Sequence, residues 1–190
     1  MLKAKPTPRL RSVFVIYGLL RTIFLLMMIF SKDYRSVQNI GNIIVQCVPL
    51  AVVSLGQTVV MIGGGIDMSV GALISFSSCI AASTMTSAQP GALLGGLCLV
   101  LGAAVVVGLL NGLGVNFGKV PAMITTLSMM MVLNGLSLAL LPGPGGRVDK
   151  AFASIVMARS GVFSVALLVL LCMFLLIRHF LYHTRHGVHV

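Results

Sequence analysis

Acidic side chains are scarce in this sequence of 190 residues, which has three aspartates or glutamates in all. Charged residues of both signs make up 8% of the chain, whereas a soluble domain carries about a quarter. A surface that faces water cannot be built from so few charges, so a soluble enzyme is excluded. The 13 basic residues are spread thinly between apolar stretches and form no basic patch, which argues against a nucleic-acid partner. With 58% apolar residues, the composition indicates a membrane protein surrounded by lipid.

Tryptophan is absent, and the sequence has no combination of aromatic rings and carboxylates that predicts a sugar-binding platform. Motifs of hydrolytic enzymes and of phosphate-binding loops are missing as well, so we expect no catalytic residue, no nucleotide hydrolysis and no cofactor. The cysteines form no C-x-x-C pair and fall inside apolar stretches, which favours free buried thiols over a disulfide or a metal site. These cysteines are Cys47, Cys79, Cys98 and Cys172.

Long uncharged intervals define the expected membrane-spanning helices. The longest interval runs from Met68 to Gly118 and has room for two helices of about 20 residues, with a turn at Ala88–Gly91. Because lipid offers the backbone no hydrogen-bonding partner, the spans are expected to be helical. We expect six spans, near residues 13–30, 41–62, 68–87, 92–116, 121–142 and 160–181. The fold class is therefore an all-α polytopic transmembrane bundle, with residues 1–190 as a single domain.

The N-terminal segment carries several basic residues ahead of the first apolar stretch and lacks a small-x-small cleavage site. We therefore expect an uncleaved first span with a cytoplasmic N-terminus. Arg21 lies in the middle of this span, where a charge costs about 2.5–3.5 kcal/mol. Its side chain is expected to snorkel or to face other helices.

Three consecutive glycines interrupt an apolar stretch and are followed closely by Asp67 and Ser69. The glycines are Gly63, Gly64 and Gly65. Glycine costs about 1 kcal/mol relative to alanine inside a helix, so this run predicts a discontinuous helix. In one interpretation Asp67 is the N-cap of the next helix and accepts a hydrogen bond from the N–H of Ser69 or Val70. In the other, the exposed backbone lines a solute path, as in transporters. Both interpretations can hold together.

Other polar and small residues at membrane depth are further candidates. Gln57 and Thr58 place polar groups just before the glycines, where they could join a solute path. The hydroxyl-rich segment 69–87 suits interhelical hydrogen bonds, which we favour, or the passage of a hydroxylated solute. The spacing of Gly108 and Gly112 predicts close packing of neighbouring helices.

Four histidines lie near the C-terminus, from His179 to His189. His179 and His183 have the i, i+4 spacing of metal ligands, but no carboxylate or thiol lies nearby to complete a site. We interpret the histidines as interfacial residues at a helix end and expect no metal site.

The segment from Gly56 to Gly71 reads GQTVVMIGGGIDMSVG and resembles the signature of the permeases of bacterial ribose/galactose/xylose-type ABC importers. That signature is G-x-T-x-V-I-x-x-G-G-I-D-L-S-V-G. A second match comprises Asn111-Gly112 and the segment VPAMITTL at 120–127, which resembles the family pattern N-G…I-P-x-F-I-x-T-L. A third match is the segment TRHG at 184–187, which resembles the T-R-x-G that opens a cytoplasmic loop.

The resemblance implies an all-helical permease subunit of an ATP-driven importer, which moves a sugar or a similar hydroxylated solute across the bacterial inner membrane. It implies as partners a second permease subunit, identical or related, cytoplasmic ATP-binding subunits that hydrolyse the ATP, and a periplasmic solute-binding protein. Thr184, Arg185 and Gly187 would begin the loop that faces the ATPase. Which sugar is carried stays open, because selectivity would lie largely with the binding protein.

Members of this family continue beyond the T-R-x-G motif into the ATPase-contacting loop and further spans, whereas this sequence ends at Val190. We therefore expect the N-terminal part of a longer family pattern, which lacks the ATPase-coupling surface and cannot transport alone. The alternative is a truncated, non-transporting membrane remnant that only binds partner helices. An embedded enzyme using Asp67 and the histidines has less support, because one deep carboxylate offers little acid–base chemistry.

Overall fold

The computed structural model describes residues 8–143, 145–160 and 163–183. The helices are α1 (Pro8–Phe30), α2 (Val37–Ile62), α3 (Val70–Thr84), α4 (Pro90–Asn116), α5 (Ala122–Leu140), α6 (Lys150–Val156) and α7 (Val165–His183). Two short strands, β1 (Arg159–Ser160) and β2 (Phe163–Ser164), pair in antiparallel fashion between α6 and α7. The predicted all-α polytopic fold class is confirmed.

Within the described residues, five helices are long and apolar enough to cross a membrane, namely α1, α2, α4, α5 and α7. The third expected span, 68–87, is a helix of only 15 residues, α3. At 1.5 Å per residue α3 is about 22 Å long, which is less than the roughly 30 Å of a bilayer's hydrocarbon core. The expected start of the last span at residue 160 was wrong, because the β1–β2 hairpin precedes α7. Helix α6 was not expected.

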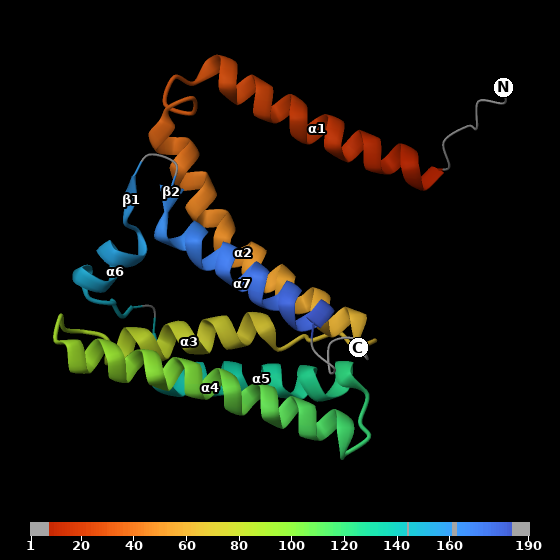
Figure 1. Cartoon of the computed structure of the whole chain (residues 1–190), viewed down its shortest axis with the longest axis vertical. Coiled ribbons are helices and arrows are strands. Elements are labelled where there is room, and N and C mark those ends of the chain that lie inside the picture. Colours follow the sequence, from red (N-terminus) through yellow and green to blue (C-terminus); the bar gives the residue numbers. More distant parts are fainter. Residues whose placement is uncertain (1–7, 144, 161–162, 184–190) are drawn as a thin grey trace.

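Figure 1 shows two groups of packed helices and one helix that stands apart. Helices α3, α4 and α5 pack on one another, and α2 runs alongside α7. Helix α1 extends away from both groups. Segments 63–69 and 117–121 lie at the same end of the molecule as the end of α7, whereas 85–89 and α6 lie at the opposite end. Helices that cross a membrane one after another place their connecting segments at alternate ends in this way.

The buried core is small and lies between α3, α4 and α5. Ala72, Val107 and Leu133 form its centre, with Phe76 and Met129 packed against them. Large apolar side chains elsewhere point outward along every long helix. Because soluble proteins rarely expose apolar surface on this scale, the exterior is that of a multi-pass membrane protein.

For Arg21, contact with other helices is excluded within the described residues, and snorkelling stays a prediction. The expected burial of three cysteines is corrected. The window Val13–Phe30 of α1 is 0% buried and Arg21 is exposed, so within the described residues Arg21 does not face other helices. Cys47, Cys98 and Cys172 are exposed rather than buried, because they lie on the outer faces of their helices.

Candidate functional site

The run of glycines ends α2 in a Schellman motif. The N–H of Gly65 donates to the carbonyl of Val60 and the N–H of Gly64 donates to that of Met61, both over 3.0 Å. Gly64 has φ +77°, the left-handed conformation that this motif requires and that side chains disfavour. The helix therefore stops at Ile62, and the predicted break is confirmed.

Gly65 brings the break close to the beginning of α5. A Cβ built on Gly65 would lie 3.4 Å from Cβ of Ala122 and 3.4 Å from Cγ1 of Val60. The chain then enters α3, which leads away from the end of α2 towards the opposite end of the molecule (Figure 1). The interruption is thus a tight reversal between two helices.

Asp67 orders the segment that leads into α3. Its Oδ1 accepts hydrogen bonds from the backbone N–H of Ser69, over 2.7 Å, and from the hydroxyl of Ser69, over 2.6 Å. The predicted bond to the Ser69 N–H is confirmed. The N-cap position, however, belongs to Ser69, since α3 begins at Val70. Asp67 lies two residues earlier and forms a local turn of the Asx type instead of a helix cap.

Ser69 links this turn to α4. Its side chain is 1% exposed, and its Oγ accepts a hydrogen bond from Nδ2 of Asn111 over 3.0 Å. Asn111 is 8% exposed, and its Oδ1 has no hydrogen-bond partner among the described residues. A buried acceptor without a partner costs about 1–3 kcal/mol, so Asn111 holds its position at an energetic cost.

Thr126 links the same segment to α5. Its hydroxyl oxygen accepts a hydrogen bond from the N–H of Met68 over 3.0 Å and donates to the carbonyl of Ile66 over 3.3 Å. Thr126 is 4% exposed. We call Asp67, Ser69, Asn111 and Thr126 the polar lock, because they join the reversal to α4 and α5 through hydrogen bonds. The lock also satisfies backbone groups that lipid could not.

The candidate path residues are not alike in their surroundings. Gly63, Gly64 and Thr58 are exposed, Gln57, Gly65 and Asp67 are half-buried, and Ser69 is enclosed by protein. Thr58 lines a cavity between α2 and α7, which measures about 580 Å³. The hydrogen bonds of Asp67 and Ser69 hold the segment between α2 and α3 in place. A contact of these two residues with solute stays a prediction.

Within this chain, the close contact between helices is made at Gly114 and not at Gly108 or Gly112. A Cβ built on either glycine meets no atom within 4 Å, so both face open space. At Gly114, in contrast, a Cβ would lie 2.6 Å from Cγ2 of Thr125 on α5. Packing of Gly108 and Gly112 against a helix of another chain stays a prediction. Spacing along a helix shows which residues share a face, but not which face meets a neighbour.

The remaining predicted residues lie at the C-terminal end. Thr184, Arg185 and Gly187 fall outside the described residues. The imidazole rings of His179 and His183 stack with centroids 5.1 Å apart. Within the described ranges, no group of three or more histidine, cysteine or acidic side chains is placed to hold a metal.

Sequence reasoning missed Asn111 and Thr126 as members of the lock. Both are polar residues inside apolar stretches, and both belong to the second match with the permease signature. That position in the sequence was the available signal. The structure brings residues of the first and second matches into one hydrogen-bonded network.

Comparisons with known proteins agree with the resemblance. Residues 39–190 match the family described as branched-chain amino acid transport system / permease component. The chain is 34% identical over 113 residues to the ribose import permease protein RbsC of Escherichia coli (strain K12), which covers 60% of this chain and 35% of that protein. It is 30% identical over 113 residues to the xylose/arabinose import permease protein XylH of Sulfolobus acidocaldarius, covering 57% and 32%.

A third relative is the autoinducer 2 import system permease protein LsrC of Yersinia pestis (strain Pestoides F), 32% identical over 123 residues, covering 64% of this chain and 34% of that protein. The chain thus spans about a third of the length of the curated relatives it matches. No solved structure matches it.

Proposed function

We propose, from the premise that this chain belongs to the family of branched-chain amino acid transport system / permease components, that it forms part of the permease of an ATP-driven importer. The match over residues 39–190 carries this proposal. The polar lock supports it, because its four residues belong to the segments that resemble sugar permeases. The same residues form the hydrogen bonds that join the reversal after α2 to α4 and α5.

The proposed solute is a sugar or a similar small hydroxylated molecule. Two of the relatives are named for the import of ribose and of xylose or arabinose, although the family description names branched-chain amino acids. The two solute classes can be separated by experiment.

The proposed setting is the bacterial inner membrane. There the chain would pair with a second permease subunit and would work with cytoplasmic ATP-binding subunits and a periplasmic solute-binding protein. ATP hydrolysis would belong to the ATP-binding subunits, and this chain would contribute membrane helices only. In alternating access, the polar lock would let α3, α4 and α5 move as one body.

Uptake measurements in the native cells test the proposal. Deleting the gene should lower the uptake of radiolabelled ribose or xylose, and a plasmid copy should restore it, while leucine uptake stays unchanged. Loss of leucine uptake alone would contradict the solute class. Unchanged uptake of all three would contradict a transport role and would favour a non-transporting membrane remnant.

Co-purification tests the partners separately. An affinity-tagged copy of the chain, extracted from the native cells in mild detergent, should carry an ATP-binding subunit with it through the second permease subunit. The matched control is an unrelated multi-pass protein with the same tag, which should not. Recovery of the chain without any ATP-binding subunit would contradict the proposed assembly.

A further inference from the structure

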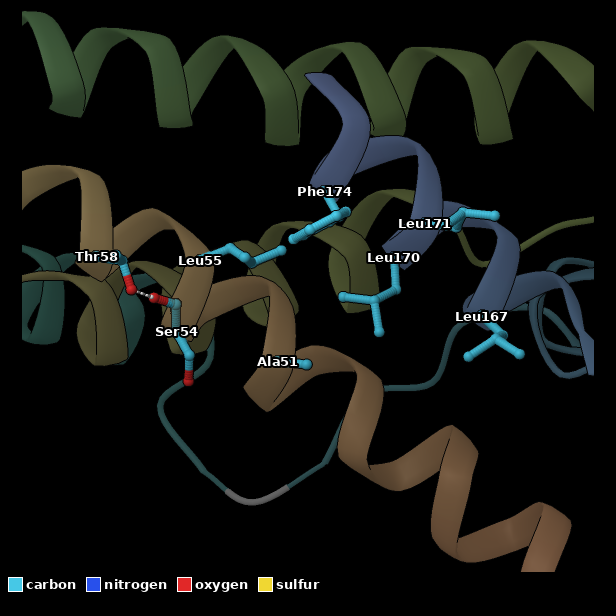
Figure 2. A pocket seen from close by; sticks show the side chains of 8 residues that line it. All are labelled: Ala51, Ser54, Leu55, Thr58, Leu167, Leu170, Leu171 and Phe174. Carbon is cyan, nitrogen blue, oxygen red and sulfur yellow. Dashed lines mark hydrogen bonds between the residues drawn. The ribbon is translucent and has the colours of Figure 1, made fainter. Parts of the chain in front are cut away.

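A groove runs between α2 and α7 on the outside of the molecule. Its wider part measures about 580 Å³ and is lined by leucines, Phe174 and Ala51, together with two hydroxyl residues (Figure 2). These eight lining side chains come only from the two helices, so the groove follows the contact between α2 and α7 on the outside of this chain.

The two hydroxyl groups in this part of the groove are already satisfied. The hydroxyl of Thr58 donates to the carbonyl of Ser54 over 2.7 Å, and that of Ser54 donates to the carbonyl of Leu50 over 2.8 Å. Figure 2 shows the bond between Thr58 and Ser54, which stays within α2. Because both donors are used inside their own helix, the groove presents an apolar wall to an occupant.

A second cavity of about 310 Å³ continues the groove towards the end of α7. The two cavities share Leu55, Thr58 and Phe174, so we treat them together as the α2/α7 groove. The character of the wall changes at this end, where Arg178 and Tyr182 join the lining. These two residues are four positions apart and therefore lie on the same face of α7.

The charge of Arg178 is not neutralised by the chain. The sequence has three acidic residues in all, and in the described ranges none of them pairs with Arg178. Arg178 is exposed, and Tyr182 is 73% exposed. An uncompensated guanidinium beside a phenol hydroxyl offers several hydrogen-bond donors to an anion, and the phosphate of a phospholipid is an anion whose oxygens can accept them.

The groove also has about the length of one phospholipid acyl chain. At 1.5 Å per residue, Arg178 lies about 16 Å along α7 from Leu167, where the apolar part ends. Half of a hydrocarbon core of roughly 30 Å is of the same length. An acyl chain has this length and ends at a polar headgroup, which matches a groove that is apolar from Leu167 to Phe174 and polar at Arg178.

We propose that the α2/α7 groove binds an anionic phospholipid, with one acyl chain between the helices and the phosphate at Arg178 and Tyr182. This inference requires that the chain is embedded in a membrane, and it does not depend on the proposed transport activity. The charge at one end of an otherwise apolar groove is what selects an anionic over a zwitterionic lipid.

Photolabelling of the purified chain in phosphatidylcholine vesicles tests the proposal. The probe is a phosphatidylglycerol with a photoreactive group in its acyl chain, and the labelled peptides are identified by mass spectrometry. Labels are expected on the segments 51–58 and 167–174. Arg178→Gln should lower this labelling about fivefold, equal to about 1 kcal/mol, the usual attraction of one basic residue near anionic lipid.

Arg147→Gln is the matched control, because it removes the same charge from a residue outside the groove and should leave labelling unchanged. Equal labelling by photoreactive phosphatidylcholine would overturn the proposal, as would equal losses in the two arginine variants. So would labels that avoid both helices, or cross-links from the groove to a second polypeptide in place of lipid.

Filling the groove gives an independent check. Ala51→Leu places a larger apolar side chain in the wider part and should abolish labelling while size-exclusion and circular-dichroism profiles stay unchanged. Ser54→Leu serves the same purpose if the first variant does not fold. Full labelling of a folded, filled variant would show that the lipid lies elsewhere and would refute the site.

Discussion

Asn111 donates a hydrogen bond from its Nδ2 to the Oγ of Ser69, over 3.0 Å, and thereby joins the later part of α4 to the beginning of α3. The hydroxyl of Ser69 in turn donates to Oδ1 of Asp67. The amide of Asn111 thus gains one hydrogen bond, while its own Oδ1 is buried without a partner among the described residues. The two effects oppose each other, and this balance can be measured.

We predict that Asn111→Leu changes the free energy of unfolding by less than about 1 kcal/mol. The variant loses an interhelical hydrogen bond worth about 0.6 kcal/mol on average in membranes, but it also removes the unsatisfied oxygen. Asn111→Asp is the matched variant of similar shape. It should cost about 3 kcal/mol or more, because it removes the donor and buries a second carboxylate near Asp67.

Unfolding of both variants is followed by circular dichroism as a denaturing detergent is added to the purified protein. A large loss of stability in Asn111→Leu would mean that Oδ1 has a strong partner in solution. Equal stability of the Asp and Leu variants would contradict the buried position of this side chain.

Thr126 provides a second test of the polar lock. Thr126→Val keeps the shape but leaves the N–H of Met68 without its acceptor, so the free energy of unfolding should fall by about 1–3 kcal/mol. Thr126→Ser keeps the hydroxyl, so its free energy of unfolding should fall less than that of the valine variant. The opposite order, with serine the less stable, would show that the methyl group rather than the hydrogen bond matters.

Local features of the fold followed from the sequence, whereas contacts between distant segments did not. Uncharged intervals predicted the long helices, and the glycines predicted the break. The bond from Asp67 to Ser69 was predictable because it spans two residues. The bonds of Asn111 and Thr126 join residues 42 and 58 positions apart, and no local pattern specifies such a pairing.

The short length of α3 is also set by tertiary contacts. Met85, which follows α3, is 2% exposed, and its carbonyl accepts a hydrogen bond from the N–H of Asp149 over 2.8 Å. A Cβ on Gly96 of α4 would lie 2.5 Å from Cγ of Met85, so only glycine leaves room for this side chain. A prediction from hydropathy alone places the end of this span beyond Met85, because apolar and small residues follow it in the sequence.

Gly64 and Gly56 should respond in opposite ways to the same substitution. Gly64→Ala forces a side chain into the left-handed region and should destabilise the protein by about 1–2 kcal/mol. Gly56→Ala lies inside α2 with no atom within 4 Å of the new Cβ, so it should stabilise by up to about 1 kcal/mol. Thermal unfolding in detergent measures both, and a stabilised Gly64→Ala would contradict the Schellman motif.

Substitutions at Gly114 and Gly108 distinguish helix contacts within the chain from helix contacts with another subunit. Gly114→Ala places a Cβ 2.6 Å from Cγ2 of Thr125, a stiff β-branched side chain, and should cost about 1–3 kcal/mol. Adding Thr125→Ala should recover much of this loss, because it removes the clashing methyl group. Gly108→Ala should leave the stability of the isolated chain unchanged or slightly raised.

If Gly108 packs against a partner subunit, the same Gly108→Ala variant should weaken the assembly. The fraction of tagged chain that co-purifies with a second permease subunit measures this effect. Unchanged assembly with Gly108→Ala would contradict the packing role that the spacing of Gly108 and Gly112 predicts.

Asp67 is the residue at which a structural role and a role in the solute path can be told apart. Asp67→Asn keeps an oxygen that accepts from the N–H and hydroxyl of Ser69, so its stability should stay within about 0.5 kcal/mol of the original. Asp67→Ala removes the acceptor and should lose about 0.5–2 kcal/mol. In the deletion strain, a plasmid copy of the asparagine variant should therefore restore sugar uptake. The alanine variant should restore less uptake, in proportion to the smaller amount of folded protein. A stable Asp67→Asn variant without uptake would instead mean that the carboxylate itself serves the solute path, because asparagine lacks its charge and its second acceptor oxygen.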